Sequence, residues 1–244
     1  MNPEASRLGL SQVTAAILVG GLGTRLRAVV SDCPKILAEV RGKPFLSYLL
    51  DQLNRHGVQK AVLCAGYQGD RVKAACGDAY GSLRLFYSQE SEPLGTAGAL
   101  RLALPQLDSD PVLVMNGDSY CDADLDDFFA WHAGCGAEAS LILTEVEDTG
   151  RYGRVSVAED GSVMRFEEKK AGAGPGWINA GVYLLGCPIL ASVPEGGSVS
   201  LERDIFPAWI GRGLVACRKR VRFLDIGTPE SYGMAERFFS ENKR

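Results

Sequence analysis

The chain has 244 residues, of which 46% are apolar, 23% charged and 8% aromatic. This balance indicates a compact globular protein and excludes a fibre, a disordered chain and a disulfide-stapled mini-protein. With 26 basic residues against 30 acidic ones, a net charge of −4 and no block of like charge, the sequence argues against a nucleic-acid groove or a polybasic membrane surface. The charge balance is still compatible with a small anionic ligand that is bound by a few basic residues.

Cysteine usage and the chain start indicate the cellular setting. The seven cysteines are never spaced as Cys-x-x-Cys, and most lie in apolar runs such as the one around Cys64, so we expect core thiols and a reducing, cytoplasmic environment. Residues 1–13 have no apolar core of a signal peptide and are expected to form a loose extension. Residues 171–194 carry no charge, but their five glycines and three prolines favour loops around a buried strand over a transmembrane helix.

Short apolar runs alternate with amphipathic stretches in residues 14–135, which predicts β-α-β units on a mostly parallel sheet. A first strand, 15–19, leads into a glycine-rich turn. Pro44 opens a helix with leucines at positions 46, 49, 50 and 53, and Gly57 ends it. The other predicted elements here are strand 61–65, helix 71–79, strand 83–87, helix 96–104, strand 112–115 and helix 124–133.

The pattern changes in residues 136–244. We expect hairpin-forming strands at 140–144, 154–157 and 162–166, a core strand at 181–185, and helices at 200–210 and 229–239. The whole of 14–244 is predicted to be one domain, in which 14–135 resembles a nucleotide-binding half and 136–244 forms a substrate-binding half on the same sheet.

The strongest motif is Gly20-Gly21-Leu22-Gly23-Thr24-Arg25-Leu26, directly after the first strand. Glycines there allow backbone N–H groups to face an anion, and Thr24 and Arg25 add a hydroxyl and a guanidinium for phosphate oxygens. No Lys-Ser or Lys-Thr follows, so the loop is not a Walker A motif. Leu26 stands where a dinucleotide fingerprint needs its third glycine, which argues against a nicotinamide-dependent oxidoreductase.

Pro34-Lys35 and Gly42-Lys43-Pro44 follow this loop, and together they resemble the sugar-1-phosphate nucleotidyltransferase family, the NDP-sugar pyrophosphorylases. The resemblance implies a Rossmann-like, mixed and mostly parallel sheet flanked by helices, of the GT-A-like class. Because the chain stops soon after the helix at 229–239, no C-terminal β-helix is expected. The family has prolines where this chain has Ile36 and Lys170.

A second matching segment, Glu92-Pro93-Leu94-Gly95-Thr96-Ala97-Gly98, resembles the part of the family that reads the base. The side chain five residues before its first glycine is Glu90, and a carboxylate suits the adjacent N–H donors of guanine; a shift in register would give this role to Gln89 or Glu92. The nucleotide-binding residues implied are Val19, Gly20, Gly21, Gly23, Thr24, Glu90, Pro93, Gly95, Thr96 and Gly117.

The resemblance also implies a metal site and a sugar site. Asp118, after the strand at 112–115, and Asp225, in Phe223-Leu224-Asp225, would hold Mg²⁺. Thr228 and Pro229 are expected to cap and start the following helix, which would leave Asp225 free for chemistry. The sugar-phosphate residues implied are Tyr152, Gly153, Glu168, Lys169, Asn179 and Glu202, with Lys169 on the phosphate.

The implied reaction joins a nucleoside triphosphate, GTP by preference, to a sugar 1-phosphate and releases pyrophosphate. Arg25, Lys35 and Lys169 would be its catalytic cations, and a phosphate nucleophile needs no general base, so His56 and His132 are expected to be structural. The motifs are most similar to guanylyltransferases acting on D-glycero-D-manno-heptose 1-phosphate for surface polysaccharides. Mannose 1-phosphate is an alternative substrate, and a non-catalytic nucleotide-sugar-binding relative is an alternative of another class. Because relatives often pair, a homodimer is also an expectation.

Overall fold

The computed structural model describes residues 9–21, 23, 26, 30, 33–66, 68–167 and 174–241. Of the residues singled out in the sequence, Thr24, Arg25, Glu168, Lys169 and Lys170 lie outside this description.

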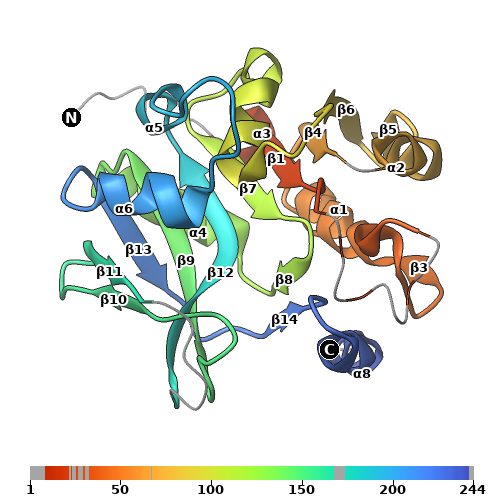
Figure 1. The fold of residues 1–244 in the computed structure, drawn as a ribbon. Coiled ribbons are helices and arrows are strands. Elements are labelled where there is room, and N and C mark those ends of the chain that lie inside the picture. The colour runs from red at the N-terminus through yellow and green to blue at the C-terminus, as the bar shows by residue number, and fades with distance from the viewer. Residues whose placement is uncertain are drawn as a thin grey trace.

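An eight-stranded sheet forms the centre of the molecule (Figure 1). Its strand order is β13 (Leu214–Arg218), β9 (Ala139–Val146), β12 (Gly176–Leu185), β7 (Val112–Asn116), β1 (Thr14–Leu18), β4 (Lys60–Ala65), β6 (Leu83–Gln89) and β5 (Ala79–Tyr80). β1 pairs in parallel with β4 and β7, β4 with β6, and β9 with β13. β12 is antiparallel to both of its neighbours, and β5 is antiparallel to β6. The prediction of a mixed, mostly parallel sheet is therefore confirmed.

Helices cover both faces of this sheet. Ala15 and Ile17 of β1 face a core shared with α1 (Phe45–Arg55) and α4 (Leu125–Cys135). Ala16, between them, faces a second core with α3 (Gly95–Ala103), α5 (Cys187–Ala191) and α6 (Phe206–Trp209). Alternation along a strand sends side chains to opposite faces, so a strand buried on both sides reads as the continuous apolar run seen here.

Three two-stranded ribbons accompany the main sheet. β8 (Ser119–Cys121) pairs with β14 (Phe223–Asp225), β10 (Val155–Val157) with β11 (Val163–Phe166), and β2 (Glu39–Val40) with β3 (Lys43–Pro44). The remaining elements are the 3₁₀ turns η2 (Leu10–Gln12), η3 (Lys35–Leu37) and η4 (Leu104–Gln106), the π-helical turn η5 (Leu201–Ile205), and the helices α2 (Gly69–Cys76), α7 (Pro229–Gly233) and α8 (Ala235–Ser240).

Several predicted boundaries were wrong. The helix predicted at 71–79 ends at Cys76, because Gly77 takes a left-handed φ of +65° that terminates it, and the chain continues into β5. Only two of the three expected hairpin strands pair with each other, since β9 joins the main sheet. The core strand expected at 181–185 begins at Gly176.

The two C-terminal helices are also less regular than their patterns. The helix predicted at 200–210 starts as η5 and becomes α6 where Pro207, which cannot donate a backbone hydrogen bond, enters. The one predicted at 229–239 is divided at Met234 into α7 and α8.

The chain start and the cysteines differ in part from expectation. Leu10 and Val13 are buried in the core, so residues 9–13 are not a loose extension. None of the seven cysteines forms a disulfide, as expected, but only Cys64, Cys121 and Cys217 are buried, and Cys135 and Cys187 are exposed. Among the described helices, none has the length and apolarity needed to cross a membrane.

Candidate active site

A cavity of about 500 Å³ opens where β1 and β7 end. Ligands of open α/β sheets bind at the carboxyl ends of the strands, and this volume suits a nucleotide-sized molecule. The predicted residues that line it are Val19, Gly20, Gly21, Gly23, Lys35, Glu90, Pro93, Gly95, Thr96 and Asp118. Gly117, Asp225 and the described members of the sugar set do not line it.

Glycines of the loop after β1 permit close packing around the cavity. Gly23 has a φ of +59°, and a Cβ on it would lie 3.1 Å from the Cβ of Lys35. The loop therefore rests on the stem of Lys35, whose backbone begins η3. This contact joins the two motifs that first suggested a phosphate site.

The carboxylate of Glu90 lies against two glycines. A Cβ built on Gly66, at the end of β4, would overlap the Glu90 Oε1 atom, and one built on Gly20 would lie 2.8 Å from it. The other oxygen, Oε2, accepts a hydrogen bond of 3.1 Å from the backbone N–H of Leu94. Desolvation raises the pKa of Glu90, while the Leu94 hydrogen bond acts in the opposite direction. The side chain thus lines the cavity, with Oε2 held by a hydrogen bond and Oε1 beside the two glycines.

Asp118 and Lys35 form an ion pair at the end of β7. The Lys35 ammonium donates to Asp118 Oδ2 at 2.6 Å. Lys35 Nζ would also lie 3.9 Å from a Cβ on Gly227, and the same Cβ would lie 2.6 Å from Asp225 Oδ1. The lysine is therefore bound to Asp118, and Gly227 lies between its ammonium and Asp225.

Asp225 is brought next to Asp118 by the β8–β14 ribbon. Asp225 pairs with Ser119 across this ribbon, and the N–H of Ile226 donates to the carbonyl of Asp118 at 2.9 Å. Asp118, directly before β8, and Asp225, at the end of β14, thus come close together although 107 positions separate them in the chain (225 − 118).

Asp225 does not cap the following helix, but its carboxylate has other partners in this structure. Arg151 Nη2 lies 3.0 and 3.1 Å from its two oxygens, and the Tyr152 hydroxyl donates to Oδ2. Burial and the Asp225 hydrogen bond raise the pKa of Tyr152, so the phenol stays protonated. Thr228 caps α7 through Ser231 as predicted, but Ser231 also contacts Asp225.

The sugar candidates Asn179 and Glu202 meet around the buried Tyr183. The Tyr183 hydroxyl accepts from Asn179 Nδ2 at 2.8 Å and donates to Glu202 Oε1 at 3.2 Å. Glu202 Oε2 accepts from the hydroxyl of Thr96, on the nucleotide side, at 3.1 Å. The structure thus connects the two halves of the predicted site through side chains.

Two predicted glycines have their N–H groups already bonded. Gly153 donates to the carbonyl of Thr149 at 3.0 Å, and Gly117 donates to the carbonyl of Leu18 at 3.0 Å. A Cβ on Gly117 would lie 2.6 Å from that carbonyl oxygen, so the glycine permits β7 to approach the end of β1. Neither glycine presents a free N–H to a ligand in this structure.

Sequence reasoning missed four residues of this region. Asn116 lines the cavity, Gly66 lies against the Glu90 carboxylate, Arg151 pairs with Asp225, and Tyr183 joins the sugar candidates. A glycine directly after a predicted buried strand was a usable signal for Gly66. The other three lie in motifs noted for their neighbours Asp118, Tyr152 and Asn179, but those motifs do not indicate the contacts that they make with residues remote in the chain.

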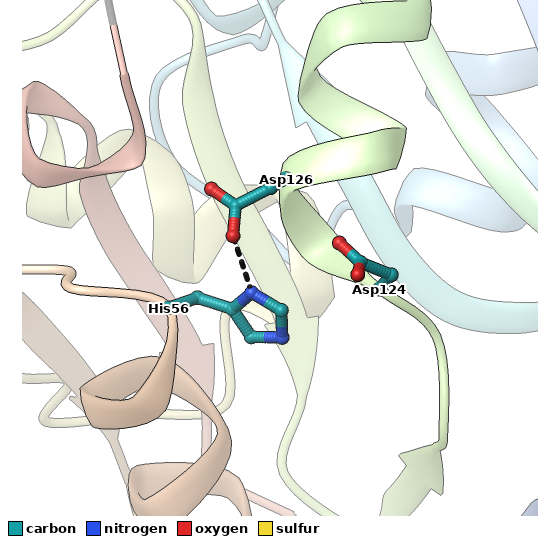
Figure 2. Close-up of side chains that lie close together, drawn as sticks. All are labelled: His56, Asp124 and Asp126. Carbon is teal, nitrogen blue, oxygen red and sulfur yellow. Dashed lines mark hydrogen bonds and ion pairs between the residues drawn. The ribbon is translucent and has the colours of Figure 1, made fainter.

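A second acidic group lies elsewhere. Figure 2 shows His56, Asp124 and Asp126, whose ligand atoms all lie within 4.8 Å of one another and so could hold a metal ion. His56 Nδ1 and Asp126 Oδ2 are 2.7 Å apart, and Asp124 caps α4 by accepting from Asp127 N. Since His56 follows α1 and precedes β4, it lies near the start of that strand, whereas the cavity lies at strand ends.

The other histidine has a packing environment. His132 on α4 is buried, and its Nδ1 lies 2.8 Å from Ser140 Oγ. Burial lowers its pKa, which favours the neutral ring. Both histidines therefore have local partners away from the cavity, as the sequence led us to expect.

Comparisons with known proteins agree with this geometry. The sequence profile described as "Nucleotidyl transferase" matches residues 14–242. D-glycero-alpha-D-manno-heptose 1-phosphate guanylyltransferase of Aneurinibacillus thermoaerophilus is 35% identical over 224 residues, which cover 91% of this chain and 96% of that protein. Mannose-1-phosphate guanylyltransferase of Mycobacterium tuberculosis is 34% identical over 91% of this chain and 63% of its own length.

A solved structure is similarly close. HddC from Yersinia pseudotuberculosis, crystallised in complex with GMP-PN, superposes with a TM-score of 0.82 at 33% identity and covers 93% of this chain and 100% of that one. With a family profile over nearly the whole chain, relatives above 30% identity and a matching fold, this chain belongs to the nucleotidyl transferase family.

Proposed function

We propose that this protein is a sugar-1-phosphate guanylyltransferase that makes a GDP-sugar and pyrophosphate from GTP and a sugar 1-phosphate. One observation carries the proposal: a single cavity gathers the glycine-rich loop, Lys35, Asp118 and Glu90, which are the groups needed for phosphates, a metal and a base. The guanylyltransferase names of its relatives support the same reaction class.

Glu90 is proposed to read the base. A carboxylate only accepts hydrogen bonds, and guanine offers two adjacent donors, so the pair is complementary. The alternatives raised by the sequence are less well placed, because Gln89 and Glu92 do not line the cavity and Glu90 does. The relative crystallised with GMP-PN supports a guanine nucleotide.

Asp118 and Asp225 are proposed to hold Mg²⁺. The donor set fits, because the β8–β14 pairing brings together two carboxylates, Asp118 just before β8 and Asp225 at the end of β14, and Mg²⁺ uses such oxygen ligands in small number. Bound there, the ion would neutralise phosphate oxygens during transfer. The carboxylates of Asp118 and Asp225 would then bind the metal in place of Lys35 and Arg151.

The chain's own cations and polar groups would do the positioning. Lys35 would neutralise phosphate charge, and Arg25 and Lys169, which lie outside the described residues, are proposed for the leaving pyrophosphate and the attacking phosphate. Asn179 and Glu202 would hold sugar hydroxyls. In-line displacement by a phosphate oxygen needs positioning and charge stabilisation above all, which this set supplies.

D-glycero-D-manno-heptose 1-phosphate is the proposed sugar substrate. A relative named for that substrate matches almost its full length to this chain. Mannose 1-phosphate is the second candidate, because a relative named for it has nearly the same identity.

The test is pyrophosphate release measured with four nucleoside triphosphates, each against heptose, mannose, glucose and N-acetylglucosamine 1-phosphates. We expect release with GTP and heptose 1-phosphate, and loss of release in Asp118→Ala with the fold retained by circular dichroism. Asp126→Asn is the matched control, since it removes a carboxylate from the other acidic group. Nucleotide-sugar binding without pyrophosphate release from any pair would instead favour a non-catalytic binding protein.

A further inference from the structure

A buried tyrosine hydroxyl lies at the centre of the sugar candidates. Tyr183 on β12 is 0% exposed, and its ring packs on Phe206 with centroids 5.2 Å apart. The main chain around it is irregular, because the β9–β12 register shifts between Asn179 and Tyr183, and Gly181 within that shift has a φ of +73°. Such a bulge turns neighbouring side chains toward a new direction, and here it brings both Asn179 and Tyr183 to the same point.

The hydrogen bonds around this hydroxyl are directional. A phenol has one proton and two acceptor sites. The Tyr183 O–H donates a hydrogen bond to Glu202, and the Nδ2 groups of Asn179 and Asn116 donate to the phenol oxygen at 2.8 and 3.4 Å. Burial, then the Glu202 charge, raise the pKa of Tyr183 well above its usual value, so the donor is always protonated.

This arrangement fixes which way the Asn179 amide faces. Its Nδ2 points to Tyr183, and its Oδ1 accepts from the Gly181 N–H at 2.9 Å. One N–H and one lone pair of the half-buried Asn179 amide are left over. A donor and an acceptor side by side are the complement of a sugar hydroxyl, which both donates and accepts.

The same hydroxyl limits what Glu202 can do. The Glu202 carboxylate accepts from Tyr183, from Thr96 at 3.1 Å and from Ser200 at 3.0 Å. Three of its roughly four acceptor sites are therefore filled from within the chain. Glu202 is oriented as rigidly as Asn179, and its link to Thr96 connects it to the helix that starts in the base-reading segment.

We infer that Tyr183 is a positioning residue for the sugar substrate: its hydroxyl orients the Asn179 amide and the Glu202 carboxylate for sugar hydroxyls without touching the sugar itself. This inference rests on the proposed function. It adds to that function a role for a residue that was not among the predicted sugar contacts.

Tyr183→Phe tests it, with the wild type's best substrate pair. We expect KM for the sugar 1-phosphate to rise about tenfold, the scale of one lost hydrogen bond to a charged partner. The KM for the nucleoside triphosphate and the affinity for the nucleotide alone, measured by calorimetry, should change less than about threefold. Tyr80→Phe is the matched control, since its hydroxyl also bonds a carboxylate, Asp51, at 2.7 Å, but at the far edge of the sheet.

Two results would overturn the inference. One is a folded Tyr183→Phe protein with wild-type KM for the sugar 1-phosphate, and the other is an equal rise in both KM values, which indicates a general structural defect. If Tyr183→Phe does not fold, Glu202→Gln and Asn179→Ala are combined in a double-mutant cycle. Non-additive effects on sugar KM support a shared network, and additive effects contradict it.

Failure of the proposed function is recognised separately. A wild-type protein that releases no pyrophosphate with any pair overturns the proposed function, and with it the role of Tyr183. An active wild type with an unaffected Tyr183→Phe variant overturns the role of Tyr183 alone.

Discussion

Replacing Glu90 with glutamine is the sharpest perturbation of the proposed base specificity. The substitution keeps the size of the side chain and keeps an oxygen for the Leu94 N–H, which Glu90 Oε2 accepts at 3.1 Å. It turns the other position, beside Gly20 and Gly66, into an NH₂ group, which under the proposed base recognition would face the donors of guanine. The fold should therefore remain intact while base recognition fails.

The size of the effect follows from the two donors of guanine. A hydrogen bond to a charged acceptor contributes about 1.5–3 kcal/mol, and glutamine removes the charge and reverses one of the two bonds. A loss of about 2–4 kcal/mol corresponds to a decrease of roughly 30- to 1000-fold in kcat/KM for GTP. Adenine presents one donor beside one acceptor and therefore loses no such pair of bonds, so kcat/KM for ATP should not fall comparably.

The assay is pyrophosphate release at several concentrations of GTP and ATP, with sugar 1-phosphate held constant. The informative quantity is the ratio of kcat/KM values for GTP and ATP, which cancels any general loss of active protein. A Glu90→Gln protein that keeps the wild-type ratio would refute base reading by Glu90.

Three further predictions follow from the site. Gly66→Ala should decrease kcat/KM for GTP at least tenfold, because the added Cβ overlaps the movable end of the Glu90 side chain. The melting temperature should change little, since the Cβ only approaches the backbone. An unchanged ratio of kcat/KM for GTP to kcat/KM for ATP would contradict this prediction. Arg151→Ala should strengthen Mn²⁺ binding, measured by calorimetry, by up to about fivefold, because a half-exposed ion pair with Asp225 is worth at most about 1 kcal/mol. The control Arg237→Ala removes a far more exposed arginine and should not change Mn²⁺ binding. Equal Mn²⁺ affinities of the Arg151→Ala and wild-type proteins would show that Arg151 does not compete with the metal. Burial raises the pKa of Glu90, so its carboxylate protonates at a higher pH than that of a free glutamate. KM for GTP should therefore rise as the pH falls through that raised pKa, and Glu90→Gln should abolish this rise. The same pH profile of KM in the wild type and in Glu90→Gln would contradict the prediction.

The part of the site made by local sequence was predictable. The glycine-rich loop after β1 and the segment around Gly95 are set by short-range chemistry: buried strands, glycines with unusual φ and helix starts. Gly95 illustrates this, because its φ is +73° and a Cβ there would lie 2.5 Å from the carbonyl oxygen of Val199. Motifs of this kind keep their meaning without knowledge of the rest of the fold.

What escaped prediction depends on strand register between distant segments. Asp225 contacts Arg151 because the β8–β14 ribbon and the turn before β10 meet, and nothing near either residue in sequence specifies that pairing. In the sequence, Tyr183 looks like one more residue of an apolar strand. Its polar role depends on the register shift in β12, which periodicity cannot reveal because a shift of one residue exchanges the two faces of a strand.

The charges of the site explain why a cation should be required under the proposed function. In this structure Lys35 is paired with Asp118 and Arg151 with Asp225, so these four side chains together carry no net charge. Glu90 is held by a backbone N–H and Glu202 by three hydroxyls, and neither has a cation partner among the described residues. Among the described residues that line the cavity, the one cation, Lys35, is therefore already paired with a carboxylate. Only if Asp118 and Asp225 turn to a divalent cation do Lys35 and Arg151 become available to phosphate oxygens, and for that reason metal and nucleotide should bind with positive coupling.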